Sequence, residues 1–177
     1  MRILSVDPGS INTGISILEL DKDNNIKIIF VDTFNAKNYL KLSKDILEIH
    51  GSRFTRINGI CNYFNKIIDI YKPDCIASEA PFYNPKNPGA YGALVEVVTS
   101  LKLTAFNLDN TLPFELIPPS NVKNAFGVNG GSGDKELMRL ALSKLNISYE
   151  LSSFDSLDEH SIDSIAVGVA KIKELIK

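Results

Sequence analysis

The stretch Arg2-Ile3-Leu4-Ser5-Val6-Asp7-Pro8-Gly9-Ser10 predicts the element around which this chain is organised. Residues 2–6 form a short, mostly apolar segment that is rich in branched side chains, which is typical of a buried β-strand. The strand runs into Asp7, and Pro8-Gly9 then breaks it. A carboxylate at the end of a core strand is costly unless it has a partner, and a metal ion is a natural partner. The alternative is that Asp7 only caps the turn, because Asp before Pro-Gly is ordinary turn chemistry.

Two more strands are predicted directly after this one. Asn12-Thr13-Gly14 is interpreted as a turn, and residues 15–20 partly alternate, as in a half-exposed strand. A polar turn at 21–25 leads to a returning strand at 26–34. The three strands together predict an antiparallel meander.

A long helix is predicted from a cap at Ser52 to a point before Pro73. Its apolar residues recur at the spacing of an amphipathic helix, and they are Ile57, Ile60, Cys61, Phe64, Ile67, Ile68 and Tyr71. The preceding segment, 35–51, has poorly spaced apolar residues, so it is interpreted as a loop or a short helix.

A second short buried strand, 74–78, also ends at a carboxylate. That carboxylate is Glu79, and Pro81 follows it closely, which repeats the situation of Asp7. If the two strands are neighbours, their terminal carboxylates converge.

The second half of the chain alternates predicted helices with one further strand. A helix spans 91–101, a strand spans 114–117, and Asp134 can cap another helix after a glycine-rich loop at 127–133. In that helix the apolar residues that share one side are Leu137, Leu140, Ala141 and Leu145. Residues 147–157 are polar and carry no clear pattern, and the chain closes on a helix with an apolar stripe from Ile162.

The size and composition predict an ordinary globular protein with one domain over residues 1–177. Hydrophobic residues make up 44% and charged residues 23%, and no apolar run is long enough for a membrane span. We expect no signal segment, and we expect Cys61 and Cys75 to be reduced core residues of a cytoplasmic protein. The net charge of −2 disfavours a broad basic coat but leaves room for a local basic face.

His160 and Asp163 stand three residues apart at the start of the last predicted helix, so they share one helix face. With Asp7 and Glu79 they offer four groups that suit Mg²⁺ or Mn²⁺. Two such ions about 3.5–4 Å apart can activate a water and stabilise the leaving oxygen of a phosphodiester. The plainer alternative is that His160 is an exposed residue at a helix start and Asp163 a first-turn acid favoured by the helix dipole.

At this point the chain resembles the RuvC-type Holliday junction resolvases of the ribonuclease H-like superfamily. Four segments carry the resemblance, and they are Ile3 to Gly9 with Thr13-Gly14; Pro73-Asp74 to Glu79 with Phe82 and Asn87; Pro119, Val122-Lys123 and the glycines to Asp134-Lys135; and His160 to Ala166. The first motif alone is weak, because Asp-x-Gly turns are common. The four together, spread over nearly the whole chain, are quite specific.

The resemblance implies an α/β ribonuclease H-like fold with a five-stranded mixed sheet, an antiparallel meander followed by parallel strands, and helices on both faces. It implies a homodimer that cuts two strands of a four-way DNA junction with divalent metal, and no membrane partner. Asp7, Glu79, His160 and Asp163 carry over as the catalytic, metal-binding tetrad. Some relatives have Asp where His160 stands, so one ligand is softer here, and we expect Mn²⁺ to support cleavage at least as well as Mg²⁺.

The resemblance also implies DNA contacts. Phe82 corresponds to an aromatic residue that inserts at the junction as a stacking platform, with Tyr83 a competing candidate and a core phenylalanine the alternative. Lys123 and Lys135 match phosphate contacts, and Arg139 and Lys86 are further candidates. Solvated surface charge is the alternative for all four cations. The low net charge leaves the strictness of junction selectivity open.

Two other functions remain possible from the sequence, besides a non-catalytic DNA-binding or structural module. A less selective endonuclease for branched or flapped DNA would use the same fold and the same residues. An actin-like ATPase-type phosphate-binding domain also begins with a strand, Asp-x-Gly and a Thr. That superfamily needs two such domains to enclose a nucleotide, and 177 residues supply one.

Overall fold

The first strand lies in the middle of the sheet in the computed structural model, which describes residues 1–85, 87–128, 134–145, 147–149 and 156–176. Within these residues the strands are β1 (Arg2–Asp7), β2 (Asn12–Leu20), β3 (Ile26–Asn35), β4 (Cys75–Glu79), β5 (Phe114–Ile117) and β6 (Ile147–Tyr149). The helices are α1 (Ala36–Leu42), α2 (Lys44–Tyr71), α3 (Pro88–Leu108), α4 (Pro119–Ala125), α5 (Asp134–Ser143) and α6 (Glu159–Leu175).

The strand order is β5-β4-β1-β2-β3-β6, and the sheet is mixed as predicted. The meander β1-β2-β3 is antiparallel, whereas β4 pairs parallel to β1 and β5 pairs parallel to β4. The described sheet has six strands and not the five expected, because β6 adds in parallel to the start of β3. This strand is only three residues long and lies in a polar stretch, so it gave no alternating pattern to detect.

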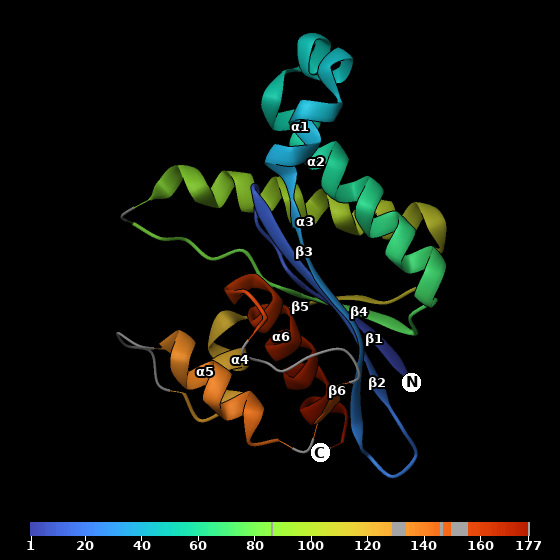
Figure 1. The fold of residues 1–177 in the computed structure, drawn as a ribbon, viewed down its shortest axis with the longest axis vertical. Coiled ribbons are helices and arrows are strands. Elements are labelled where there is room, and N and C mark those ends of the chain that lie inside the picture. Colours follow the sequence, from blue (N-terminus) through green and yellow to red (C-terminus); the bar gives the residue numbers. More distant parts are fainter. Residues whose placement is uncertain (86, 129–133, 146, 150–155, 177) are drawn as a thin grey trace.

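Successive side chains of the central strands point to opposite faces of the sheet, and both faces are buried. Leu4 and Val6 pack with Phe64 of α2 and Leu101 of α3 on one face. Ile3 packs on the other face in a core that is built largely from α6. Figure 1 shows these two layers, with α2 and α3 on one side of the sheet and α4, α5 and α6 on the other. The prediction of helices on both faces is confirmed.

The long helix begins earlier than predicted, at Lys44 and not at Ser52. Its path is broken at Gly51, where φ is 76° and ψ is 167°, so the segment that runs straight over the sheet does start after Gly51. The uncertain segment before it forms α1 and the first turns of α2, and these project beyond the sheet (Figure 1).

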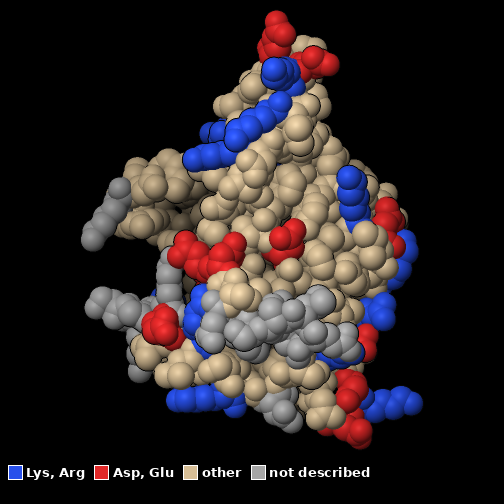
Figure 2. All heavy atoms as spheres, viewed as in Figure 1, with Lys and Arg blue, Asp and Glu red and all other residues tan. Residues whose placement is uncertain are grey.

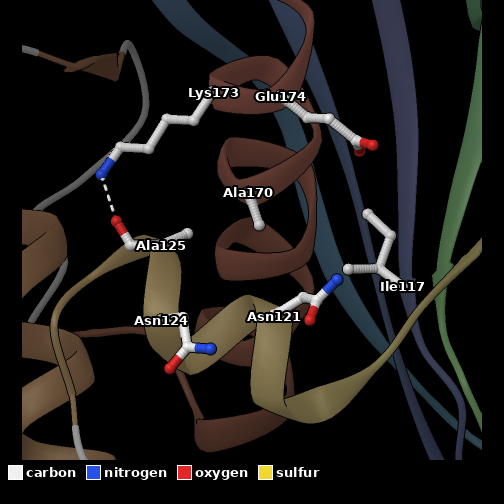
Figure 3. Close-up of a pocket in the computed structure, with 7 residues that line it drawn as sticks. All are labelled: Ile117, Asn121, Asn124, Ala125, Ala170, Lys173 and Glu174. Carbon is white, nitrogen blue, oxygen red and sulfur yellow. Dashed lines mark hydrogen bonds between the residues drawn. The ribbon is translucent and has the colours of Figure 1, made fainter. Parts of the chain in front are cut away.

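The short helix α4 is connected to α6 through contacts of Lys173 with the end of α4. The Nζ of this lysine donates to the backbone oxygen of Ala125 at 2.7 Å (Figure 3). It also lies 4.6 Å from the ring centroid of Phe126. A hollow of about 520 Å³ lies beside this contact, between Ile117 and the facing sides of both helices. The attachment matters for the site because α4 carries Lys123.

Cys61 and Cys75 are both free thiols, and Cys75 is buried. Burial raises the pKa of Cys75 to about 11, in agreement with its prediction as a reduced core residue. Among the described residues, no helix combines the length and the apolar character that a membrane span requires.

Candidate active site

Two of the predicted acids lie at the carboxyl ends of neighbouring parallel strands. Val6 of β1 is paired with Ser78 of β4, and the next residue on each strand is the acid, Asp7 on β1 and Glu79 on β4. Parallel strands end at the same edge of a sheet, so the register brings the two carboxylates to one place. This confirms the convergence on which the sequence-based prediction depended.

The start of α6 is brought to the same edge by a close approach of two backbones. A Cβ atom added at Gly14 would lie 2.0 Å from the backbone oxygen of His160, so only glycine lets α6 begin this close to β2. Gly14 is in turn paired with Asp7 across the meander. Close packing against α6 therefore explains why the sequence motif has a glycine at position 14.

The first turn of α6 is held in place by Asp158, which is the N-cap. Its side chain accepts from the backbone N–H of Ser161 at 2.8 Å and from the hydroxyl of Thr33 at 2.7 Å. Glu159 stands in the first turn. Asp158 therefore stands just before the helix and Glu159 in its first turn, and Asp163 lies one turn farther along.

His160 lies between Asp7 and Asn12. Its Nδ1 is 2.8 Å from Oδ2 of Asp7, and its Nε2 is 3.4 Å from the amide nitrogen of Asn12. An amide nitrogen only donates, so this arrangement needs a bare Nε2 and a proton on Nδ1 that is donated to the carboxylate. The hydrogen bond with Asp7 raises the pKa of the imidazole above its ordinary value. His160 is thus a partner of Asp7 and not an isolated residue at a helix start.

The sequence-based prediction missed the two asparagines behind His160. Asn35 donates from its amide to Oδ1 of Asn12 at 3.0 Å, which makes a chain from Asn35 through Asn12 and His160 to Asp7. Asn12 was predicted in a turn, but it is the first residue of β2. Its Asn-Thr-Gly context is ordinary turn chemistry, and Asn35 lies 23 residues away, so no local spacing joined the two residues.

Glu79 stands in a strongly negative environment. The pKa of this carboxyl is raised to about 7, first by burial and then by the charges of Asp7 and Asp163, while the charge of Lys123 acts in the opposite direction. Three carboxylates therefore act on one another at this edge of the sheet. This electrostatic coupling brings Asp163 into the same group as the two strand-end acids.

The donor set suits a hard divalent cation. Carboxylate oxygens are the ligands that Mg²⁺ and Mn²⁺ prefer, and a cation among them would offset the repulsion that raises the pKa of Glu79. Among the described residues, no three His, Cys, Asp or Glu side chains already lie in the arrangement of a metal site. Both ring nitrogens of His160 face protein groups, Nδ1 toward Asp7 and Nε2 toward Asn12, so His160 would have to give up a hydrogen bond to bind a metal ion.

Phe82, predicted to contact DNA, follows β4 in an exposed segment. Its side chain is 51% exposed, so the alternative of a core phenylalanine is wrong. Tyr83 is exposed as well, and its ring packs edge-on against Tyr91 at 5.9 Å between centroids. Phe82 lies three residues after Glu79, close in sequence to the catalytic edge.

The predicted phosphate-binding cations have different surroundings. Lys123 lies in the last turn of α4 and acts electrostatically on Glu79. Arg139 donates to the backbone oxygen of Leu157 at 2.8 Å and lines a hollow of about 190 Å³ that Asp163 also lines. Lys135 belongs to α5, but its side chain lies outside the described part, as does Lys86.

The sequence comparisons point to one family. The model of the family described as "Crossover junction endodeoxyribonuclease RuvC" matches residues 3–171. A curated protein of that name from Christiangramia forsetii is 29% identical over 163 residues, which cover 88% of this chain and 73% of the relative. Another from Caldicellulosiruptor saccharolyticus is 26% identical over 172 residues, which cover 97% and 92% of the two chains.

Solved structures show the same fold. Thermus thermophilus RuvC superposes with a TM-score of 0.70 at 16% identity, over 99% of this chain and 96% of that one. The fowlpox virus resolvase, in a complex with Holliday junction DNA, gives a TM-score of 0.60 at 17% identity and covers both chains completely. At these identities the likeness is one of fold.

We predict that Glu79→Gln stabilises the metal-free protein at pH 8. A carboxyl whose pKa rises on folding favours the unfolded state once that state ionises, so the cost is absent below about pH 4.5, grows between about pH 4.5 and 7, and is constant above that. Gln carries no charge at either pH. Urea unfolding with a chelator should show the variant more stable than the wild type by about 2 kcal/mol at pH 8 and equal to it near pH 4.

Glu48→Gln, at an exposed position of α2, is the matched control and should change stability little at either pH. A Glu79→Gln protein that is no more stable than the wild type at pH 8 would show that folding does not raise the pKa of Glu79.

We predict that Asn12→Ala slows DNA cleavage without weakening DNA binding. Losing one hydrogen bond of about 1 kcal/mol frees the His160 ring, so the single-turnover rate at saturating protein should fall about 5-fold. Dissociation constants for uncleaved DNA should stay the same. Asn110→Ala, in the exposed loop before β5 at the opposite end of the sheet, should leave both quantities unchanged. Equal losses in rate and affinity would contradict a positioning role.

Proposed function

Because the chain belongs to the crossover junction endodeoxyribonuclease RuvC family, it is a junction-resolving endonuclease, and we propose that Asp7, Glu79, His160 and Asp163 form its hydrolytic site. The observation that carries this proposal is the register of β1 and β4, which puts Asp7 and Glu79 at one edge of the sheet, where His160 bonds Asp7 and the charge of Asp163 acts on Glu79. Carboxylates gathered in this way are typical of a functional site.

Nucleases of this family depend in general on divalent metal ions. We propose Mg²⁺ or Mn²⁺, two ions to each site, with Asp7, Glu79, His160 and Asp163 as the ligands. Such ions supply charge stabilisation at a phosphodiester and make water a nucleophile at neutral pH. Hydrolysis by direct attack of water needs no covalent protein intermediate, so no nucleophilic side chain is required.

The chain's own groups have supporting roles in this proposal. His160 fixes the orientation of Asp7 through its Nδ1–H, and Asn12 and Asn35 in turn fix the ring. Lys123 is the cation that lowers the pKa of Glu79, so it also offsets the negative field that a phosphate meets at this edge.

We also propose that Phe82, Lys123, Lys135 and Arg139 contact the DNA. An exposed aromatic ring near the catalytic edge suits a base that has lost its stacking neighbour at the crossing of strands. The three cations suit phosphates, which fix the position of DNA without reading its sequence. The substrate is DNA, and we propose that the chain acts as one nuclease domain in the cytoplasm, or in a host cytoplasm if the chain is viral.

A homodimer is the proposed assembly, because resolving a four-way junction takes two cuts and each subunit supplies one site. Large apolar side chains are exposed along α3, with Leu103 at 56% and Phe106 at 59% exposure. Such side chains are typical of a surface that pairs with a second copy. Light scattering of the purified protein at micromolar concentration should give the mass of two chains, and the mass of one chain would contradict the proposal.

Junction cleavage tests the function directly. We predict that the purified protein cuts a synthetic four-way junction only with a divalent ion, and that Asp7→Asn lowers the rate about 100-fold or more. In parallel titrations, Mn²⁺ should support cleavage at least as well as Mg²⁺. Cleavage that persists in chelator, or full activity of Asp7→Asn, would show that the hydrolytic site lies elsewhere.

The competing function on the same fold is a less selective endonuclease for branched or flapped DNA. Four-way, three-way and flapped substrates of matched sequence separate the two functions in the same assay. A resolvase should cut the four-way substrate fastest and in two opposed strands. Equal rates on all three substrates would favour the broader activity.

A further inference from the structure

The part of the molecule that the proposed site does not use is the projection formed by residues 36–56, which we name the helical arm. It comprises α1 and the first turns of α2, and it extends away from the sheet beyond the end of β3 (Figure 1). The sequence alone did not settle its structure or its purpose.

The helical arm is basic in a chain that is acidic overall. It carries five Lys and Arg residues against two Asp and Glu residues, whereas the whole chain has a net charge of −2. Figure 2 shows Lys and Arg side chains gathered along this projection, on a face that also displays acidic side chains in its middle. A local basic surface beside a negative one separates phosphate contacts from the hydrolytic centre.

Three of these cations are exposed and have no carboxylate partner within the described residues. They are Lys37 and Lys41 on α1 and Lys44 at the start of α2. Lys37 and Lys41 are four residues apart, so they share one helix face, where like charges repel each other. Arg53 differs, because it pairs with Glu96 of α3 and helps to fix the arm. The three lysines, which form no ion pair within the described residues, suit a polyanion.

The base of the arm is rigid and is tied to the proposed active site. The ring of Tyr39 packs against the backbone of α2 so closely that a Cβ at Gly59 would lie 2.5 Å from it. Asn35 caps α1 by accepting from the N–H of Lys37, and the same side chain donates to Asn12, the partner of His160. The arm therefore has a fixed position relative to the catalytic edge.

We propose that the helical arm is a second DNA-binding surface, on which Lys37, Lys41 and Lys44 contact the phosphates of a duplex arm of the branched DNA. This proposal rests on the proposed function, since it assigns part of the substrate to this surface. Its occupant is double-stranded DNA, because the lysines offer point charges for phosphates along an exposed helix and no pocket for a base.

The test is the salt dependence of DNA binding by Lys37→Gln/Lys41→Gln. A labelled four-way junction is titrated with protein in chelator, which prevents cleavage, and anisotropy is read at several salt concentrations. Each lost phosphate contact should lower the slope of log affinity against log salt by about 0.9, so the double variant should lose about 2. Affinity near 0.1 M salt should fall about 10-fold.

The matched control is Lys22→Gln/Lys72→Gln, which removes the same charge at the opposite end of the sheet. Lys22 lies in the turn between β2 and β3, and Lys72 ends α2 just before β4. The control should keep the wild-type slope. Lys37→Arg/Lys41→Arg should also keep it, because Arg retains the charge, and circular dichroism verifies that every variant is folded.

The outcomes separate this proposal from the proposed function. A wild type that neither binds nor cuts the junction overturns the function. A wild type that binds and cuts, with an arm variant of unchanged slope and affinity, overturns the arm proposal alone. An equal loss of slope in the control pair also overturns it, because the effect would then come from overall charge.

Discussion

The fold of this chain holds several carboxylates close together at one end of a sheet, and the surrounding structure has to offset their repulsion. The parallel pairing of β1 and β4 puts Asp7 and Glu79 at the same edge, and the seat of α6 brings Asp163 to them. Each carboxylate raises the free energy of the folded state when it is ionised beside the others. The layers on both faces of the sheet offset that cost, because the strands leading to the acids are buried on both sides. The acids therefore stand at the ends of strands that are packed on both faces, which suits a site that must hold its geometry while a charged substrate arrives.

The groups around these carboxylates come from several elements, and Asp7 and Glu79 have different neighbours. His160 of α6 contacts Asp7 and is in turn contacted by Asn12 of β2, and Lys123 acts on Glu79 from α4. Asn35 belongs to both this hydrogen-bond network and the cap of α1, so β3 links the candidate site to the helical arm. In this arrangement the centre of the candidate site is negative, whereas the cations that suit DNA lie on helices around it. An enzyme whose active centre is negative needs cations placed around that centre in order to bind a polyanion.

The sequence was most informative where one local pattern settled a position. Apolar runs ending in Asp7 and Glu79 predicted strand ends, and the parallel register then brought them together. The sequence was least informative where tertiary packing determined which side chains are buried. In α5 the predicted inward residues Leu137 and Leu140 are about half exposed, and Met138 and Leu142 are buried, because apolar residues occupy two sides of that helix and packing against α6 selects one. The link between Asn12 and Asn35 joins neighbouring strands, and no spacing along the chain reveals such a pair.

The contact between Gly14 and the first turn of α6 involves main-chain atoms on both sides. The helix is therefore seated on β2 through a main-chain contact, which does not depend on which side chain stands at position 160. The imidazole at this position adds its own hydrogen bonds to Asp7 and Asn12. A different polar side chain would change what Asp7 and Asn12 meet and leave the main-chain contact available, so selection can exchange the side chain while the glycine keeps the helix close to the strand.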